Sequence, residues 1–539
     1  MKLELKYIYI IPVLFLCQFL IVQSVNGQVK VPEKCLYHFN DLQRKQTWTN
    51  SYNAAGLHFI DFDNSSYIET YVNKNDGPFV KYYESDNSIN FGLKTASYTK
   101  IKKTVYYGKI DYNNFVGQNM TWSGLINPER YMLLLANDIP AEKAKESYKI
   151  SGGFSTPLTK NLLLGVKLNY EVGNLTKRKD LRHETRLLDI EVCGGLIYKT
   201  DWLNVGANYY YQKFHENIKF SKIAKDEINY NGYLFKGLWF GVMDTWSQDV
   251  LNLSRPFVDK QNGGSLQFEF LLNNYMRFFN EFTYKNQKGI TGPGADKEYS
   301  QSEAVSYEYK GIFQFEKETT RHYLRLNTNY TDANNYDKIT NNEYIGGIYI
   351  VRYYGLNKTF SKWKFNFNPE YEVAFGKYKS NPDWNIKIGY NYSSQSSISS
   401  LVYPFYFTQD IIVNSEYLKI NKNLFWHKGM IDLSLLGSYS KGCGEKLKQH
   451  KGTLTTTEQI SEDIIPYQQV DMLNREYEFL TTGKFHGEAG IRYSCFLTSK
   501  KLTGAIYIDG KYRFTTTSEL AYHQGSHAGM FSLALGFSF

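Results

Sequence analysis

The end of the chain alternates strictly between large apolar and small side chains. A period of two is typical of a β-strand with two different faces. The apolar positions are Phe531, Leu533, Leu535, Phe537 and Phe539, and the small positions between them are Ser532, Ala534, Gly536 and Ser538. The pattern therefore predicts a final strand with one strongly apolar face.

The same alternation recurs along much of the chain, in segments that mostly have about nine to thirteen residues. A mean globular strand has about five or six residues, whereas a tilted strand that crosses a membrane needs about nine to eleven. The segment lengths therefore favour a transmembrane barrel over a soluble sandwich. Clear examples are residues 162–172, 363–375, 384–392, 485–497 and 502–514.

The polar faces of these segments carry full charges. The core of a soluble β-sandwich would not tolerate such charges unpaired, but they can line the wet lumen of a barrel. We therefore predict an all-β fold, an antiparallel transmembrane β-barrel over residues 66–539, with a β-helix or another large secreted β-protein as the alternative. The candidate lumen-lining residues are Lys364, Glu370, Glu372, His486, Glu488, Arg492, Asp509, Lys511 and Arg513.

One predicted strand carries three of these residues on the same face. His486, Glu488 and Arg492 would form either a charged constriction or a solvated wall, and the wall is the favoured interpretation.

Short and long connections alternate between the predicted strands, as periplasmic turns and extracellular loops do in outer-membrane barrels. The short connections lie at 157–160, 199–201, 273–274 and 499–500, and the longer ones lie near 116–145, 215–229, 287–302 and 442–474. We expect about 16 strands, within a range of roughly 14 to 18, and an even number is usual for such barrels.

Residues 1–27 have the pattern of a secretory signal peptide. Lys2 and Lys6 precede the apolar stretch 7–22, and small residues lead to a cleavage position before Gln28. A membrane anchor helix is the alternative, but the stretch is short for a span of about 20 residues. We therefore expect cleavage of this peptide and a location in the cell outer membrane.

Residues 28–65 are less regular and predict either a periplasmic extension or a small N-terminal plug inside the barrel. Within them, residues 51–57 resemble a stretch in the N-terminal hatch of outer-membrane transporters for long-chain fatty acids. The resemblance implies a barrel of fourteen strands that passes hydrophobic molecules through a hatch and a lateral opening. It marks Asn53, Ala54, Ala55, Gly56 and Leu57 as candidate plug residues.

A second resemblance concerns nearly the whole mature chain. The segments 107–109 (Tyr-Gly-Lys) and 119–128, together with the final Phe-Ser-Phe, are similar to an uncharacterised outer-membrane barrel family of Bacteroidota. That family implies a fold and a location but no activity, and it suggests a packed loop around Trp122 and Pro128. The terminal strand also resembles the signal that the barrel assembly machinery reads, which implies that machinery as a partner of Phe531, Leu533, Leu535, Phe537 and Phe539.

Composition agrees with this fold class. Aromatic residues make up 17% of the chain, with 47 Tyr and 35 Phe, as expected where aromatic girdles mark both membrane interfaces. The formal net charge is +9, and no segment resembles a nucleic-acid-binding module. The one local basic cluster, residues 177–183, could attract lipopolysaccharide or an anionic solute, although a solvated loop is the favoured interpretation.

Enzymatic motifs are absent from the sequence: it has no P-loop, dinucleotide fingerprint, HExxH or GxSxG. The loop with His523, Ser526 and His527 lacks a carboxylate at a telling distance. We therefore expect no enzyme, no cofactor and no metal site.

Two functions fit the predicted barrel. The first is a channel or transporter for a small solute, and the alternative is a surface protein whose long loops bind a partner or a polysaccharide. The chain is short for an energised receptor with a large plug domain, although it could work beside such a receptor. The expected partners are outer-membrane lipid and lipopolysaccharide, the barrel assembly machinery, and an outer-membrane receptor or lipoprotein.

Overall fold

The computed structural model describes residues 39, 46–60, 64–223, 230–246, 254–292, 300–346, 348–376, 382–402, 405–426, 429–451, 467–498, 503–518 and 520–539. The predicted signal peptide, residues 1–27, lies outside these segments, and so does much of the predicted extension 28–65.

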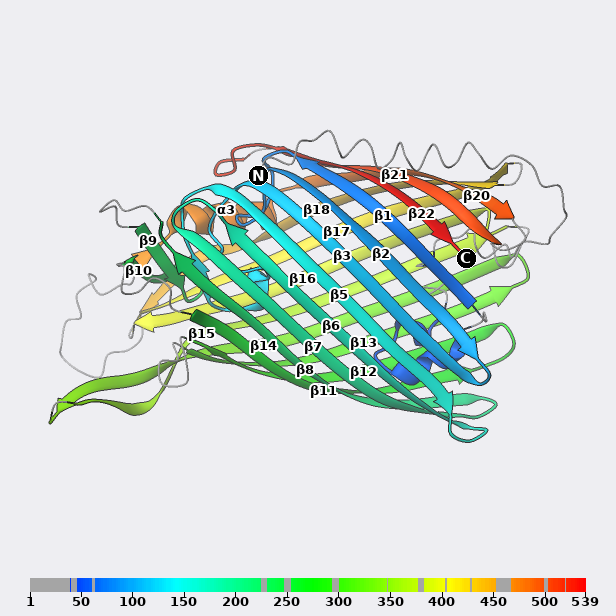
Figure 1. The fold of residues 1–539 in the computed structure, drawn as a ribbon, viewed down its shortest axis with the longest axis horizontal. Helices are drawn as coiled ribbons and strands as arrows, with labels where there is room; N and C mark the ends of the chain where they lie inside the picture. Colours follow the sequence, from blue (N-terminus) through cyan, green and yellow to red (C-terminus); the bar gives the residue numbers. More distant parts are fainter. Residues whose placement is uncertain are drawn as a thin grey trace.

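Over these segments the chain is an all-β protein, a closed antiparallel barrel of 18 strands (Figure 1). The count is two above the central expectation of about 16 strands. The strands are β1 (Asn64–Asp76), β2 (Asn87–Ile101), β3 (Thr104–Met120), β5 (Ala141–Pro157), β6 (Leu162–Lys177), β7 (Arg182–Lys199), β8 (Leu203–Ser221), β11 (Ser254–Leu271), β12 (Met276–Thr291), β13 (Ser300–Lys317), β14 (Thr320–Ile345), β15 (Ile348–Phe375), β16 (Trp384–Val402), β17 (Phe405–Trp426), β18 (Gly429–Lys451), β20 (Lys484–Thr498), β21 (Thr503–Thr517) and β22 (His527–Ser538).

The first and last strands close the barrel. β1 pairs with β22 from Tyr67 opposite Ser538 to Asp76 opposite Gly529. The backbone of Ser66 also exchanges two hydrogen bonds with that of Phe539, at 2.8 and 2.9 Å. The final residue is therefore part of the closing ladder, and closure leaves neither of these two strands with an open edge.

Alternating side chains give the barrel an apolar exterior. On β22, Phe531 and Leu533 are exposed, whereas Ala534, Gly536 and Ser538 are buried on the other face. Exposed apolar residues occur on strands all around the wall, among them Ile68, Phe91, Ile150, Val192, Leu266, Phe282, Ile388, Leu435, Ile491 and Ile508. Such an apolar outer surface is what a barrel presents to lipid.

The strands are longer than their sequence pattern suggested, from 12 residues in β22 to 28 in β15. Residues 335–345, where the alternation is weak, continue β14, and this strand and β15 extend from the wall as a long hairpin (Figure 1). Several expected loops are correspondingly shorter: β8 runs to Ser221 and β18 to Lys451. Hydrogen bonds to the neighbouring strand maintain these extensions, and a local pattern does not reveal them.

The two ends of the barrel differ. At the short-turn end, where Phe539 lies, three residues or fewer separate β7 from β8 and β13 from β14. At the opposite, long-loop end, several connections fold into a small antiparallel sheet of β4 (Leu134–Ala136), β9 (Tyr230–Phe235), β10 (Phe240–Trp246) and β19 (Tyr467–Gln468). The helix α3 (Val470–Thr481) follows this sheet. We call these five elements the cap.

Three short 3₁₀ helices complete the described elements: η3 (Trp48–Asn50), η4 (Ala54–Phe59) and η5 (Pro128–Arg130). None of the helices in the described segments is long and apolar enough to cross a membrane.

Candidate functional site

An N-terminal segment, residues 46–60, packs against the inner wall of the barrel near the short-turn end (Figure 1). We call it the plug segment. Trp48 is buried and donates a hydrogen bond from Nε1 to Glu269 of β11 at 2.6 Å. The backbone N–H of Tyr52 donates to Glu281 of β12 at 2.9 Å. These bonds fix the segment to carboxylates that face the lumen.

The candidate plug residues Asn53 to Leu57 lie at the centre of this segment. The side chain of Asn53 caps η4 by accepting from the Ala55 N–H at 3.0 Å, and it donates to Gln267 of β11 at 3.0 Å. Ala54, Ala55, Gly56 and Leu57 are all buried. The polar side chain of Asn53 and the apolar residues of η4 together make this part of the segment complementary to the wall.

Glycines in the wall allow this close approach. A Cβ at Gly165 of β6 would lie 2.1 Å from the backbone nitrogen of Ala55, and one at Gly195 of β7 would lie 2.1 Å from Asn53 Oδ1. Neither glycine has a positive φ, so the requirement is for space alone. The wall is therefore shaped to receive the plug segment.

The cap covers the long-loop end with an apolar core. This core combines cap residues such as Leu135, Phe235 and Met472 with inward-facing residues of distant barrel strands, including Phe220 of β8 and Phe405 of β17. Trp122 packs against the same core, in agreement with the packed loop expected around it. The cap thus joins widely separated parts of the barrel wall across the lumen.

A carboxylate of α3 is buried against the cap. Glu476 accepts a hydrogen bond from Trp239 Nε1 at 2.7 Å. Burial raises the pKa of Glu476, and the Trp239 hydrogen bond and Lys362 of β15 oppose that shift. The helix is therefore bound to the rest of the cap by a specific polar contact as well as by apolar packing.

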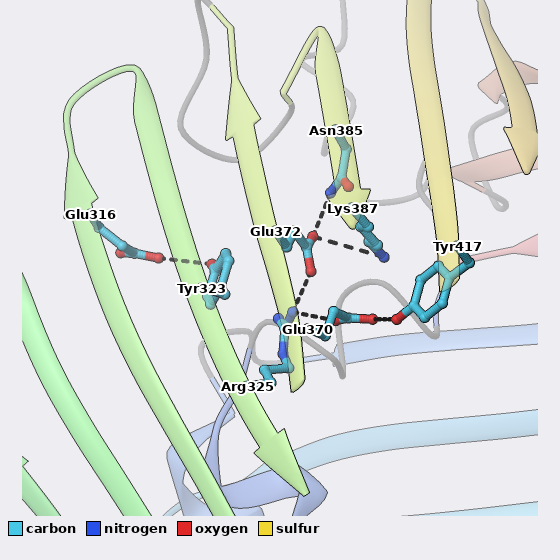
Figure 2. A network of polar contacts seen from close by, with 8 residues as sticks. All are labelled: Glu316, Tyr323, Arg325, Glu370, Glu372, Asn385, Lys387 and Tyr417. Carbon is cyan, nitrogen blue, oxygen red and sulfur yellow. Dashed lines mark hydrogen bonds and ion pairs between the residues drawn. The ribbon is translucent and has the colours of Figure 1, made fainter. Parts of the chain in front are cut away.

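Two of the predicted lumen residues, Glu370 and Glu372 of β15, join the polar network in Figure 2. Arg325 of β14 contacts both, at 2.9 Å to Glu370 and 2.5 Å to Glu372. Tyr417 of β17 donates to Glu370 at 2.6 Å, and Lys387 of β16 lies 3.8 Å from Glu372. Two cations balance two carboxylates across four strands, which indicates a structural wall rather than a binding site.

Lys364 lies outside this network. It is on the same strand, closer to the long-loop end, where it interacts electrostatically with Glu129 of η5. Arg325 and Tyr417 are not among the residues predicted from the sequence, although each belongs to the inward face of an alternating strand. Lys387 is on the polar face of the predicted strand 384–392 but is not among the candidate lumen residues.

Five other predicted lumen residues come together on β20 and β21: Glu488, Arg492, Asp509, Lys511 and Arg513. Arg513 forms an ion pair with Glu488, and Lys511 lies 2.9 Å from Asp509. The guanidinium of Arg492 stacks over Tyr507 at 3.6 Å, a cation–π contact that holds it in place.

Four of these five residues, all except Glu488, border a cavity of 310 Å³ on the inner face of β1, β2, β21 and β22. Its lining includes four cations (Lys94, Arg492, Lys511 and Arg513) and two carboxylates (Glu69 and Asp509). The small residues Ser532, Ala534 and Ser538 of β22 line it as well. The small side chains on the inner face of β22 thus help to leave space for this cavity.

A second cavity of 450 Å³ lies on the same side of the lumen, nearer the long-loop end. Arg513 and Met530 line both cavities, so the two adjoin along β21 and β22. His486 borders the second one and contacts Thr515 at 3.1 Å. The lumen therefore holds two adjoining charged cavities that extend from the region of Tyr67 to the long-loop end of β1 and β22.

The loop that contains His523 is packed against neighbouring side chains rather than open to solvent. His523 lies between the rings of Phe79 and Phe479, at centroid distances of 5.1 and 5.7 Å. Within the described segments, no group of three or more His, Cys, Asp or Glu residues could hold a metal ion.

Comparisons with known proteins give one family match and several distantly similar solved structures. Residues 54–539 match the model of a family described as "Family of unknown function (DUF6850)", and no curated protein matches the chain. Solved structures that align with it include the RagAB peptide transporter (7% identity, 88% of this chain and 86% of that chain, TM-score 0.43). Another is the siderophore receptor PiuA from Acinetobacter baumannii (8% identity, 88% and 82%, TM-score 0.37). Identities and scores this low leave the function to be argued from the chain itself.

These findings do not support the resemblance to fatty-acid transporters. The matching family is one of unknown function, and the described barrel has 18 strands where the fatty-acid transporters have fourteen. The similarity of residues 51–57 reflects a short turn that packs against a wall.

Proposed function

Since the chain belongs to this family of unknown function, its role has to be argued from its geometry, and we propose that it is an outer-membrane barrel that transports a small solute through its lumen. The proposal rests on one observation: two adjoining, charged cavities lie along the inner faces of β1, β21 and β22. Charged groups in a lumen are solvated and can tune which solutes pass.

The plug segment and the cap occupy the two ends of the lumen. The plug segment is hydrogen-bonded to β11 and β12, and the cap core packs on strands from β8 to β17. Solute passage would require one or both to move, so we propose a gated transporter rather than an open pore. In the outer membrane, the short-turn end would face the periplasm and the cap would face outward.

Flux through proteoliposomes tests this proposal. Purified full-length protein should permit swelling in small charged or polar solutes, at a rate that increases with the amount of protein. Swelling no faster than that of protein-free liposomes, for every solute tried, would contradict transport.

The alternative function is a surface protein that binds a partner. The β14–β15 hairpin favours it, because Tyr344 and Ile348 near the tip have 64% and 67% of their surface exposed. Contiguous exposed apolar residues often mark an interaction site. If the alternative function is correct, shortening the hairpin between Ile339 and Leu356 should abolish binding of the partner. If the transport function is correct, the same change should leave solute flux unaltered.

A further inference from the structure

The basic cluster that the sequence marks at residues 177–183 is divided between two environments. Lys177 ends β6, His183 lies near the start of β7, and the two residues pair across the hairpin. Both face inward and are buried, with only 3% and 4% of their surface exposed. For these two residues the solvated-loop interpretation is therefore wrong.

A third basic residue continues the row. Lys143 of β5 pairs with Lys177 and also has 3% of its surface exposed. Directly paired residues on adjacent strands have Cβ atoms about 4.5–5.5 Å apart. Lys143, Lys177 and His183 thus form a buried basic row across three strands.

No carboxylate compensates this row at close range. Among the residues that the structure describes, neither lysine has an ion pair within 4.0 Å. Lys143 donates to the carbonyl of Ser123, and Lys177 donates to Asn137 Oδ1 at 2.7 Å. Asp138 and Asp180 attract Lys177 only from farther away. Nε2 of His183 is buried without a hydrogen-bond partner.

Adjacent buried cations are costly to maintain, because burial penalises each charge and like charges repel. An anion beside them would offset both effects. Space for one exists, because Lys143 lines the 450 Å³ cavity together with Lys145, His486 and Arg513. The carboxylates on that lining are Asp76 and Glu84.

We propose that this cavity binds a small soluble anion with a carboxylate or phosphate group, an inference that rests on the proposed transport function. Lys143 contacts the anion directly: an ammonium group has three donors, and within the described segments this one donates a single hydrogen bond, to Ser123. Lys177 and His183 lie behind it and add positive potential. The transported solute is then a small organic or inorganic anion.

Isothermal titration of the purified full-length protein with inorganic phosphate, and separately with citrate, tests the site. Wild type should bind at least one of them, and Lys143→Gln should weaken that binding about tenfold through loss of a charge-assisted hydrogen bond. Lys160→Gln is the matched control, since Lys160 is exposed in the turn between β5 and β6. Absence of binding by wild type, or equal binding by Lys143→Gln, would overturn the proposal.

A second variant keeps the test decisive if Lys143→Gln does not fold. Lys177→Gln removes a charge of the row that lies off the cavity lining, and it should weaken binding about threefold. If Lys177→Gln binds as tightly as wild type, the basic row has no role and the proposal fails.

Flux measurements separate this inference from the proposed function. Anion binding without solute flux would uphold the site and contradict transport. Flux that neither prefers anions nor is inhibited by phosphate would uphold transport and contradict the anion site.

Discussion

The indole Nε1 of Trp48 donates a hydrogen bond of 2.6 Å to Glu269, a residue 221 positions later in the sequence. Thr47 donates to the other oxygen of the same carboxylate at 3.1 Å. One inward-facing side chain of β11 therefore holds the start of the plug segment. In the proposed gating, displacement of the plug segment is one of the movements that would let the barrel conduct.

The wall glycines that contact the plug segment, Gly165 and Gly195, should be essential for its docking. Gly165→Ala places a methyl group 2.1 Å from the Ala55 nitrogen, whereas Gly194→Ala meets no atom within 4 Å. We expect the first variant to speed limited proteolysis of the plug segment about tenfold, since cleavage follows the population of the open form. Gly194→Ala should be cleaved like wild type. Equal proteolysis rates for Gly165→Ala and Gly194→Ala would show that close packing at Gly165 does not hold the plug segment in place.

Local sequence pattern was sufficient for the barrel wall. Alternation at Phe531, Leu533 and their neighbours predicted both faces of β22, and it placed Glu488 and Arg492 on one face of β20. The same alternation continues through residues 320–330, where Arg325 occupies a position on the inward face. The barrel class was therefore predictable from the side-chain period together with the segment lengths and the charges on the polar faces.

The cap and the basic row were beyond such a pattern. The cap sheet joins residues 134–136, 230–235, 240–246 and 467–468, and pairing between such distant short segments leaves no local signal. The basic row depends on the registers that join β5 to β6 and β6 to β7. When the strand register is unknown, the sequence gives no reason to expect different burial for Lys177 and Lys179, although only Lys177 is buried.

The Arg325 network should stabilise the wall. Arg325→Met leaves Glu370 and Glu372 with less compensation in a setting where their side chains are only 15% and 6% exposed. We expect the free energy of unfolding in detergent to fall by about 3 kcal/mol, as when a buried ion pair loses one partner. Arg186→Met breaks an exposed ion pair with Glu184 and should change the free energy of unfolding by less than about 1 kcal/mol. An equal effect of the two substitutions would contradict the assigned role.

His523 should make the docking of its loop sensitive to acid. Burial lowers its pKa to about 4, and Arg475 and Lys484 act in the same direction while Glu478 opposes them. The unfolded form takes up a proton near pH 6.5 and the folded form does so only near pH 4. Stability should therefore fall as the pH drops from about 6.5 to 4 and then level off.

Thermal unfolding followed over that pH range measures this effect. His523→Phe should flatten the dependence, and His527→Phe should retain it because His527 is exposed. A wild-type melting temperature that rises on acidification through this range would contradict the assignment.

The terminal phenylalanine should matter for assembly. Its side chain is 51% exposed on the outer face, and its backbone pairs with Ser66. Phe539→Asp should reduce the heat-modifiable, folded protein in outer-membrane fractions several-fold, because a charge on the lipid-facing side is costly. Ser532→Asp puts the same charge on the inner face and should have little effect. Equal losses would mean that the outer face of β22 is not what the assembly step reads.

Single-channel recording of Trp48→Ala in planar bilayers tests the gated-lumen account most directly. Loss of a buried Trp typically costs about 3–5 kcal/mol, enough to release the plug segment for much of the time. Trp202→Ala is the control, since Trp202 is 63% exposed in the turn between β7 and β8. We predict rare, brief openings for wild type and Trp202→Ala, and frequent or sustained openings for Trp48→Ala. Equal conductance in all three proteins would contradict the claim that the plug segment gates this barrel.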